Sequence, residues 1–321
     1  MAALVTGPLG SGLAAVTGAL WEARRRLYEW GVLAPEKLPA RVVSIGNLTV
    51  GGAGKTTLVL HLARQLAGLG VDVAVVTRRY RPGPGGRGDE EFLYLDAVGP
   101  ARTFAGRSKR VLARAAAAAG ARLVLVDDGF SHWGLARALD LVLVDRTDPW
   151  GGGRLLPAGR LREPLRALQR ADVVIVTRLG VGEDPAPWLA EAARRAPGAF
   201  VAAARHEVAG VRGLDDTPVA PEGPARVVTG TGNPGAVSRS AREAGFMPVT
   251  LSGWRDHHWW SVAEATREHR AAAGGVLLLT AKDAARWPAG APRDGVAVLE
   301  TAWRWLYGGE EVERRVREAA P

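Results

Sequence analysis

The sequence contains no cysteine, which excludes disulfides, thiolate zinc sites and cysteine nucleophiles. Lysine is also scarce, since it occurs only at Lys37, Lys55, Lys109 and Lys282. The formal net charge of +9 and the pI of about 10.6 therefore come mainly from arginine. A basic chain favours anionic partners such as nucleotides, nucleic acids or acidic membrane surfaces. Because the basic residues are scattered and form no recognisable nucleic-acid module, we expect no nucleic-acid partner.

The sequence also lacks a strongly apolar run of the roughly 20 residues that a membrane span needs. The nearest stretch is Ala2–Trp21, which is uncharged but weakly hydrophobic and rich in glycine. It has no basic leader or cleavage pattern, so we do not expect a cleaved signal peptide. Because the arginine cluster Arg24–Arg26 follows it, the stretch is typical of an interfacial membrane anchor. A helix packed on the protein's own surface is the alternative.

The 321 residues, 47% hydrophobic and 23% charged, describe an ordinary globular protein with room for two domains. Strand-like apolar runs alternate with helix-length segments, which predicts an α/β fold with a doubly wound, mainly parallel sheet. The runs in the first half are Val42–Ile45, Val71–Thr77, Leu123–Val126, Leu141–Val144 and Val173–Thr177. A second set, Arg226–Thr229, Val276–Thr280 and Val296–Glu300, predicts a smaller α/β domain. We expect domains at 1–210 and 211–321, with the boundary in the Pro/Gly-containing stretch Glu207–Pro224.

Residues 44–57 read SIGNLTVGGAGKTT and lie between a predicted strand and a predicted helix, as a phosphate-binding loop (P-loop) must. The usual pattern begins with glycine, but Thr49 occupies that position here. Glycine backbone N–H groups and the helix N-terminus would hold the phosphates, Lys55 would reach the β- and γ-phosphates, and Thr56 would bind Mg²⁺. The predicted nucleotide-binding residues are Thr49, Val50, Gly51, Gly52, Ala53, Gly54, Lys55, Thr56 and Thr57.

Acidic residues supply further candidates. Asp127 and Asp128 directly follow an apolar strand, where carboxylates commonly hold the metal of a bound nucleotide. Asp89 and Glu90 follow a Gly/Pro/Arg-rich loop, which we expect on the same rim as the P-loop, where they could bind Mg²⁺ or accept a proton. Read alone, such an acidic run is also common on solvated surfaces.

Two other motifs are less specific by themselves. His257 and His258 are adjacent, so they cannot share one face of a helix or strand as a metal pair, but one could act with a catalytic base. A packed or surface histidine is the simpler interpretation. The loop 156–164, LPAGRLREP, carries arginines that could bind phosphate in a bidentate manner.

Taken together, these motifs resemble the tetraacyldisaccharide 4'-kinase family. The resemblance covers about Val42 to Asp283 and rests on nine motifs in order. They are GNLTVGGAGKT (46–56), GDE (88–90), DDGF-x-H (127–132), LDLVLVD (139–145), LPAGRLREP (156–164), ADVVIVTR (171–178), GTGNP (230–234), DHH (256–258) and T-x-KD (280–283).

The resemblance implies an ATP- and Mg²⁺-dependent kinase that phosphorylates the 4'-hydroxyl of a tetraacyl glucosamine disaccharide 1-phosphate in lipid A biosynthesis. It further implies peripheral attachment to the cytoplasmic face of the inner membrane through the N-terminal segment, and an active site in a cleft between two domains. We expect a monomer.

The resemblance also implies roles for individual residues. Lys55 and Thr56 would bind phosphate and metal, while Glu90, Asp127 and Asp128 would lie near the metal. Asp89 would be the catalytic base, and His257 would pair with it from across the cleft.

The chain departs from the family at Ser131, at Ala281 and at Thr77–Arg81, which bears on the identity of the acceptor lipid more than on the reaction. Two alternatives therefore stay open. One is a P-loop kinase for another glycolipid or a small metabolite. The other is a partitioning-type nucleotide-switch ATPase. Residues 51–57 of this chain, GGAGKTT, fit the loop pattern of that class, although Val50 occupies the place of its signature lysine.

Overall fold

The computed structural model describes residue 5 and residues 7–320. Residue contacts divide the chain into two compact units, and each unit draws on separate parts of the sequence. Unit 1 comprises Met1–Arg78, Ala97–Arg205 and Arg304–Pro321, and unit 2 comprises Arg79–Asp96 and His206–Trp303. The expected division at 210 places one boundary close to the observed one. The expected division did not place the segment 79–96 in unit 2, and it did not place the C-terminal residues, which follow Trp303, in unit 1.

Unit 1 is built on a parallel sheet whose strand order is β3-β2-β4-β1-β5-β6-β7. The strands are β1 (Arg41–Asn47), β2 (Val73–Arg78), β3 (Thr103–Gly106), β4 (Leu123–Asp127), β5 (Leu139–Asp145), β6 (Val173–Thr177) and β7 (Phe200–Gly213), which continues into unit 2. The central strands are buried along almost their whole length. Continuous burial requires cover on both faces of the sheet, which explains why these strands read as unbroken apolar runs.

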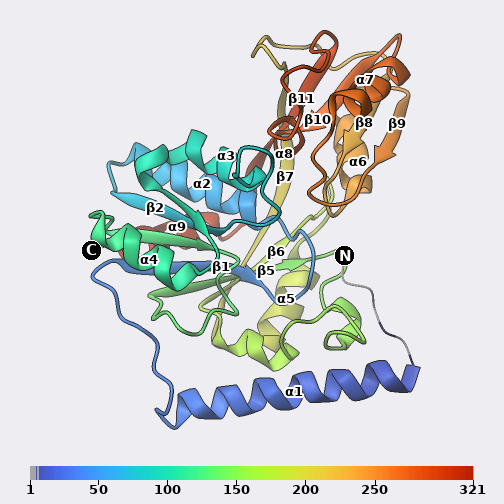
Figure 1. Ribbon diagram of the computed structural model, residues 1–321. Helices are drawn as coiled ribbons and strands as arrows, with labels where there is room; N and C mark the ends of the chain where they lie inside the picture. The colour runs from blue at the N-terminus through green and yellow to red at the C-terminus, as the bar shows by residue number, and fades with distance from the viewer. Residues whose placement is uncertain (1–4, 6, 321) are drawn as a thin grey trace. The chain divides into compact units, whose positions relative to one another are not determined.

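Helices cover both faces of this sheet (Figure 1). They are α2 (Lys55–Gly68), α4 (Lys109–Ala118), α5 (Ala186–Arg195) and α9 (Gly309–Glu318), with 3₁₀ turns at Pro100–Arg102, Gly151–Gly153 and Leu165–Arg170. Ala113 and Ala116 of α4 pack on the side chains of alternate residues of β1, β2 and β4. Alternation places the other residues of these strands on the opposite face, where α2 lies (Figure 1).

The N-terminal helix α1 (Gly7–Glu29) runs along one side of unit 1 (Figure 1). Its Trp21 is buried in a cluster with Trp133, Leu161 and Leu168, and the Trp21 indole N–H donates to Glu163 at 2.8 Å. Within the described residues, no helix is both long enough and apolar enough to cross a bilayer.

Unit 2 has a second sheet region with the order β7-β11-β10-β8-β9. It contains β8 (Ala225–Thr229), β9 (Val249–Gly253), β10 (Val276–Thr280) and most of β11 (Val296–Tyr307), together with α6 (Pro234–Ala244), α7 (Val262–Ala271) and the short α8 (Ala281–Ala284). The helix α3 (Asp89–Val98) begins in this unit. Two apolar clusters, one around Trp260 and Trp287 and one around Phe246, form its core.

The stretch Glu207–Pro224, where a domain boundary was expected, is partly a strand. Residues up to Gly213 continue β7, and only the segment after them is a turn, closed by a hydrogen bond from Gly213 N–H to Thr217 O at 2.8 Å. The predicted strand at Val296–Glu300 is likewise longer and reaches Tyr307. The short strands β3 and β9, whose residues are half-buried or exposed, were not predicted.

Candidate active site

The P-loop, defined here as residues 49–57, connects β1 to α2 and ends in the first turn of that helix. Gly51 and Gly54 have φ values of +130° and +93°, which side chains with a Cβ rarely adopt, so these glycines are required by the backbone. The Lys55 ammonium donates to Asn47 Oδ1 at 2.8 Å and lies 3.5 Å from an Asp128 carboxylate oxygen. The loop thus presents an ammonium group at a helix N-terminus, which is an arrangement suited to an anionic ligand.

Asp127 and Asp128 lie beside the strand that leads into the P-loop, because Asp127 of β4 is paired with Ile45 of β1. Asp128 adopts a left-handed conformation, with φ of 53°. Its carboxylate receives a hydrogen bond from Arg162 at 2.7 Å and lies 4.0 Å from the Lys109 ammonium. Burial would raise the pKa of Asp128, but the charges of Lys55, Arg162 and Lys109 outweigh it and hold that pKa far below its usual range.

Lys109 and Arg162 are site residues whose role the sequence did not reveal. Lys109 is almost fully buried and donates to the Asp128 carbonyl at 2.6 Å, and burial lowers its pKa. Arg162 is one of the loop arginines that could bind phosphate, and here it binds Asp128. The only signal for Arg162 was its position in the LPAGRLREP motif, and Lys109 lies in no motif that the sequence revealed.

The oxygen donors in unit 1 fit a hard divalent cation, because Mg²⁺ prefers carboxylate and hydroxyl oxygens. Thr56 and Asp127 are both buried at this edge of unit 1. Both oxygens of Asp128 accept from Arg162. Asp128 would therefore have to exchange this arginine for a metal ion.

In unit 2, Asp89 Oδ2 lies 2.9 Å from His257 Nδ1, and Asp89 Oδ1 accepts from the Glu90 N–H at 2.9 Å. Burial would raise the pKa of Asp89, but the hydrogen bond from His257 and the charges of Lys282 and Arg286 lower it on balance. Burial would lower the pKa of His257, yet the bond to Asp89 raises it on balance. The two shifts are what an ionised carboxylate paired with an imidazolium produces.

Basic residues of α8 and the turn after it surround this pair. Lys282 lies 2.5 Å from Glu90, and the buried Arg286 lies 3.6 Å from Asp89 while binding Asp283 at 2.5 Å. Burial would raise the pKa of Glu90, but Lys282 lowers it. Glu90 is therefore ionised, which is the form in which a glutamate binds a metal ion. Its present partner is the Lys282 ammonium group.

Asp89 and His257 lie in the same unit, which corrects the expectation that the pair forms across a cleft between two domains. The reason is that the segment 79–96 packs with 206–303. Arg81 donates to the Asp256 carbonyl at 3.2 Å, and the Trp259 indole donates to the Arg81 carbonyl at 3.0 Å. The Tyr80 ring meets His257 edge-on at 5.2 Å. Tyr80 and Arg81, which lie in the stretch Thr77–Arg81 where the chain differs from the family pattern, thus help to position the pair.

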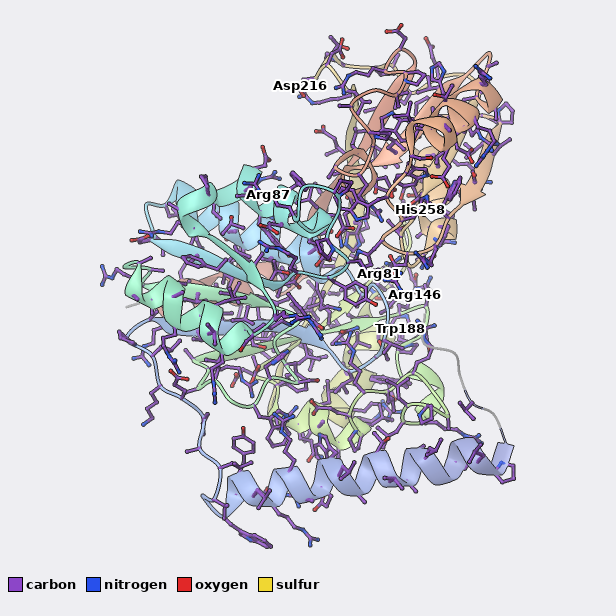
Figure 2. All side chains as sticks on the ribbon, in the orientation of Figure 1. Arg81, Arg87, Arg146, Trp188, Asp216 and His258 are labelled. Atoms are coloured by element: carbon purple, nitrogen blue, oxygen red, sulfur yellow. The ribbon has the colours of Figure 1, made fainter. Side chains whose placement is uncertain are left out.

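The structure distinguishes the two adjacent histidines. His258, labelled in Figure 2, stacks on Trp254 at 4.5 Å and lies 3.3 Å from a Glu264 oxygen. His257 contacts Asp89 and has a positive φ of 59°, a conformation that is uncommon outside glycine. His257 is therefore the candidate catalytic histidine, whereas His258 packs in the aromatic cluster.

The predicted site residues form two groups. The P-loop, Asp127 and Asp128 belong to unit 1, and Asp89, Glu90 and His257 belong to unit 2. Each group is assembled within its own unit.

Comparisons with known proteins agree on one family. The model of the family described as tetraacyldisaccharide-1-P 4'-kinase matches residues 8–319. The chain is 35% identical to the tetraacyldisaccharide 4'-kinase of Anaeromyxobacter sp. (strain Fw109-5), over 82% of this chain and 78% of the relative. It is 33% identical to that of Anaeromyxobacter sp. (strain K), over 96% and 91% respectively.

A solved structure shares the fold. The apo form of LpxK from Aquifex aeolicus in complex with ATP aligns with a TM-score of 0.70 at 22% identity, covering 97% of this chain and 98% of that chain.

Proposed function

Because the chain belongs to the tetraacyldisaccharide-1-P 4'-kinase family, we propose that it transfers the γ-phosphate of ATP to the 4'-hydroxyl of tetraacyldisaccharide 1-phosphate in lipid A biosynthesis. The family match over residues 8–319 carries this proposal. In the reaction, the bond between the γ-phosphorus and the bridging oxygen breaks and ADP leaves. The sugar oxygen bonds to phosphorus and gives up its proton.

The P-loop would bind the ATP phosphates through its backbone N–H groups and Lys55. Phosphoryl transfer requires mainly positioning and neutralisation of charge, which an ammonium at a helix N-terminus supplies. Mg²⁺ would neutralise charge on the β- and γ-phosphates when bound. The oxygen donors that would hold it are Thr56 and Asp127, with Asp128 and Glu90 as the other candidates. The relative in the solved complex with ATP supports the nucleotide assignment.

Asp89 would orient the acceptor hydroxyl and receive its proton, with His257 holding the carboxylate. This assignment is supported by their 2.9 Å contact, by the burial of Asp89 and by the lowered pKa that keeps it ionised. An ionised carboxylate with no proton of its own is the required form of a general base.

We also propose that α1 attaches the protein peripherally to the cytoplasmic face of the inner membrane. Leu9, Leu13, Val16 and Leu20 are exposed, and their spacing places them along one stripe of the helix. Trp21 lies on a different face and packs on unit 1. An exposed apolar stripe on a helix that ends in arginines is typical of a segment lying in a bilayer interface. Packing on the protein's own surface accounts for Trp21, and the exposed stripe supports the proposed interfacial role.

A cavity of about 510 Å³ lies beside α1 in unit 1 and suits an acylated substrate. Its lining includes Ala14, Leu155, Ala158, Leu161 and Leu165. Ser11 and Arg154 also line it. The apolar part of the lining would hold an acyl chain, because apolar surface gains free energy when water leaves it.

The proposal is tested by incubating the protein with labelled ATP, Mg²⁺ and tetraacyldisaccharide 1-phosphate. We expect a bisphosphorylated lipid, and we expect Lys55→Ala to abolish it. Lys37→Ala, which removes an exposed lysine outside the P-loop, serves as the control. Intact ATP binding without any lipid product would refute this acceptor and favour a kinase for another glycolipid or metabolite. ATP hydrolysis to ADP and phosphate, with no phosphorylated lipid or other acceptor, would favour a nucleotide-switch ATPase.

A further inference from the structure

The backbone carbonyls of the P-loop are held by side chains that lie mostly outside it. Every carbonyl from Thr49 to Ala53 accepts a hydrogen bond from a side chain. The five donors are Asn47 to Thr49 O at 2.8 Å, Arg160 to Val50 O at 2.9 Å, Lys55 to Gly51 O at 3.5 Å, Arg178 to Gly52 O, and Thr177 to Ala53 O at 3.0 Å. Three of the donors, Thr177, Arg178 and Arg160, come from later parts of the chain.

Arg160 reaches the P-loop because its backbone runs alongside it. The Val50 N–H donates to the Arg160 carbonyl at 2.8 Å, and the Arg162 N–H donates to the Leu48 carbonyl at 2.8 Å. These bonds flank an antiparallel bridge between Thr49 and Leu161. We name residues 160–162 the strap. The strap pairs with residues 48–50, at the start of the P-loop, where Thr49 replaces the usual first glycine.

Each arginine also forms an ion pair with a carboxylate, which restrains its direction. Arg160 lies 3.1 Å from Asp148, and Arg178 lies 2.9 Å from Asp145 at the end of β5. Thr177 is fully buried at the end of β6, directly before Arg178. A guanidinium that bridges a carboxylate and a carbonyl has little freedom left, because its donors form a rigid planar fork.

These bonds determine where the N–H groups of the loop point. In a planar trans peptide, the N–H of one residue points opposite to the carbonyl of the residue before it. Carbonyls held toward Arg160, Arg178 and Thr177 therefore turn the following N–H groups away from these side chains. Fixing the N–H groups before the ligand arrives removes part of the ordering cost of binding.

We propose that Arg160, Arg178 and Thr177 are positioning residues that preorganise the P-loop for a nucleotide polyphosphate. They act on the backbone carbonyls and leave phosphate contact to the N–H groups and Lys55. This inference rests on the proposed ATP binding at the P-loop. It predicts that their loss weakens nucleotide affinity and leaves the rate at saturating ATP nearly unchanged.

The first experiment measures the Kd for Mg-ATP by calorimetry, with kcat and the KM for ATP, in Arg160→Ala, Arg178→Ala and Thr177→Val. Each change removes one side-chain hydrogen bond to the loop. We therefore expect the Kd and the KM to rise about ten-fold and kcat to change by less than about three-fold. Arg102→Ala is the matched control. Arg102 also bridges a carboxylate, Asp72, and a carbonyl, that of Ala119, but lies far along the chain from the loop. We expect its Kd to equal that of the wild type.

The second experiment separates positioning from direct phosphate contact. Asp145→Asn and Asp148→Asn release the arginines from their carboxylates. If the arginines position the loop, ATP binding weakens in these variants. If the arginines bind phosphate themselves, releasing them and removing a negative charge strengthens ATP binding, which would overturn the proposal.

Two further outcomes have distinct meanings. Wild-type affinity in the Arg160, Arg178 and Thr177 variants, or a loss of kcat at unchanged affinity, would overturn this inference alone. Failure of the wild-type protein to bind ATP would overturn the proposed function and this inference with it. Thermal unfolding of every variant, compared with that of Arg102→Ala, identifies any that lose affinity through misfolding.

Discussion

At the scale of single residues, variants of Asp89 and His257 give the sharpest test of whether a residue of the site is catalytic or only structural. Both side chains lie mostly away from solvent, and each sets the charge state of the other. If they act as one proton-accepting unit, removal of either disables the same step.

We expect Asp89→Asn and His257→Gln each to lower kcat by about 100-fold or more, since a positioned base contributes that much. The double variant should lose little beyond the larger single loss, because residues that act as a unit are not additive. His258→Gln is the matched control, since this neighbour packs in the aromatic cluster. Steady-state kinetics checks the prediction, and losses that multiply in the double variant would contradict it.

The same pair predicts a dependence of stability on pH. The pKa of Asp89 lies below its usual 3.8, so its contribution is present above that value and lost as pH falls through the lowered pKa. The pKa of His257 lies above its usual 6.5, so its contribution is present below that value and lost as pH rises through the raised pKa. The pair therefore stabilises the protein most between these two values.

We expect the coupling free energy between Asp89 and His257 to be larger at about pH 5.5 than at about pH 9. Denaturant unfolding of the wild type, Asp89→Asn, His257→Gln and the double variant measures this coupling at each pH. Equal coupling at both pH values would show that the pair is not an ion pair.

The P-loop residues could be predicted because their chemistry is contiguous in the sequence. Glycines, Lys55 and Thr56 fall within one short segment between a strand and a helix. The surroundings of Asp128 could not be predicted, since Lys109 and Arg162 reach it only through strand order and the path of the strap. Likewise, the strand ending at Thr177 was predicted, but no local pattern shows that this end lies beside the loop.

At the scale of elements, long buried strands were predictable and short or half-exposed ones were not. The central strands β4 and β6 lie where unbroken apolar runs predicted them, because both of their faces are covered. By contrast, β9 exposes several of its side chains, so its sequence carries no clear apolar signal. The second half of β7 lies in the Pro/Gly-containing stretch where a domain boundary was expected, so it was not predicted as a strand.

For α1, we expect binding to anionic vesicles to depend on the exposed stripe. The double variant Leu13→Gln/Leu20→Gln should weaken partition at least about ten-fold, because apolar surface no longer enters the interface. The control Ala15→Gln/Ala19→Gln adds the same polar groups to exposed positions away from the stripe. Vesicle sedimentation checks this, and equal binding by both variants would contradict the interfacial role.

At the scale of the whole molecule, the division into two units predicts how a nucleotide changes stability. ATP at about 100 times its Kd stabilises the state that binds it by about 2.7 kcal/mol. The P-loop belongs to unit 1. We therefore expect ATP to raise the unfolding temperature of unit 1, seen by calorimetry as a shift of one transition where two are resolved.

Lys55→Ala should abolish this shift, whereas Lys37→Ala should retain it. A shift that persists in Lys55→Ala would show that ATP stabilises the protein from another site.

The place of the segment 79–96 in unit 2 limits how chimeras between this protein and its relatives can be made. The chain passes from one unit to the other after residues 78, 96, 205 and 303. Neither unit is therefore a single block of the gene, and a chimera whose one junction lies between residues 89 and 257 would separate Asp89 from His257. Transplanting unit 2 from a relative with a different acceptor requires exchange of both 79–96 and 206–303. Exchange of 206–303 alone would leave Asp89 from one parent facing His257 from the other.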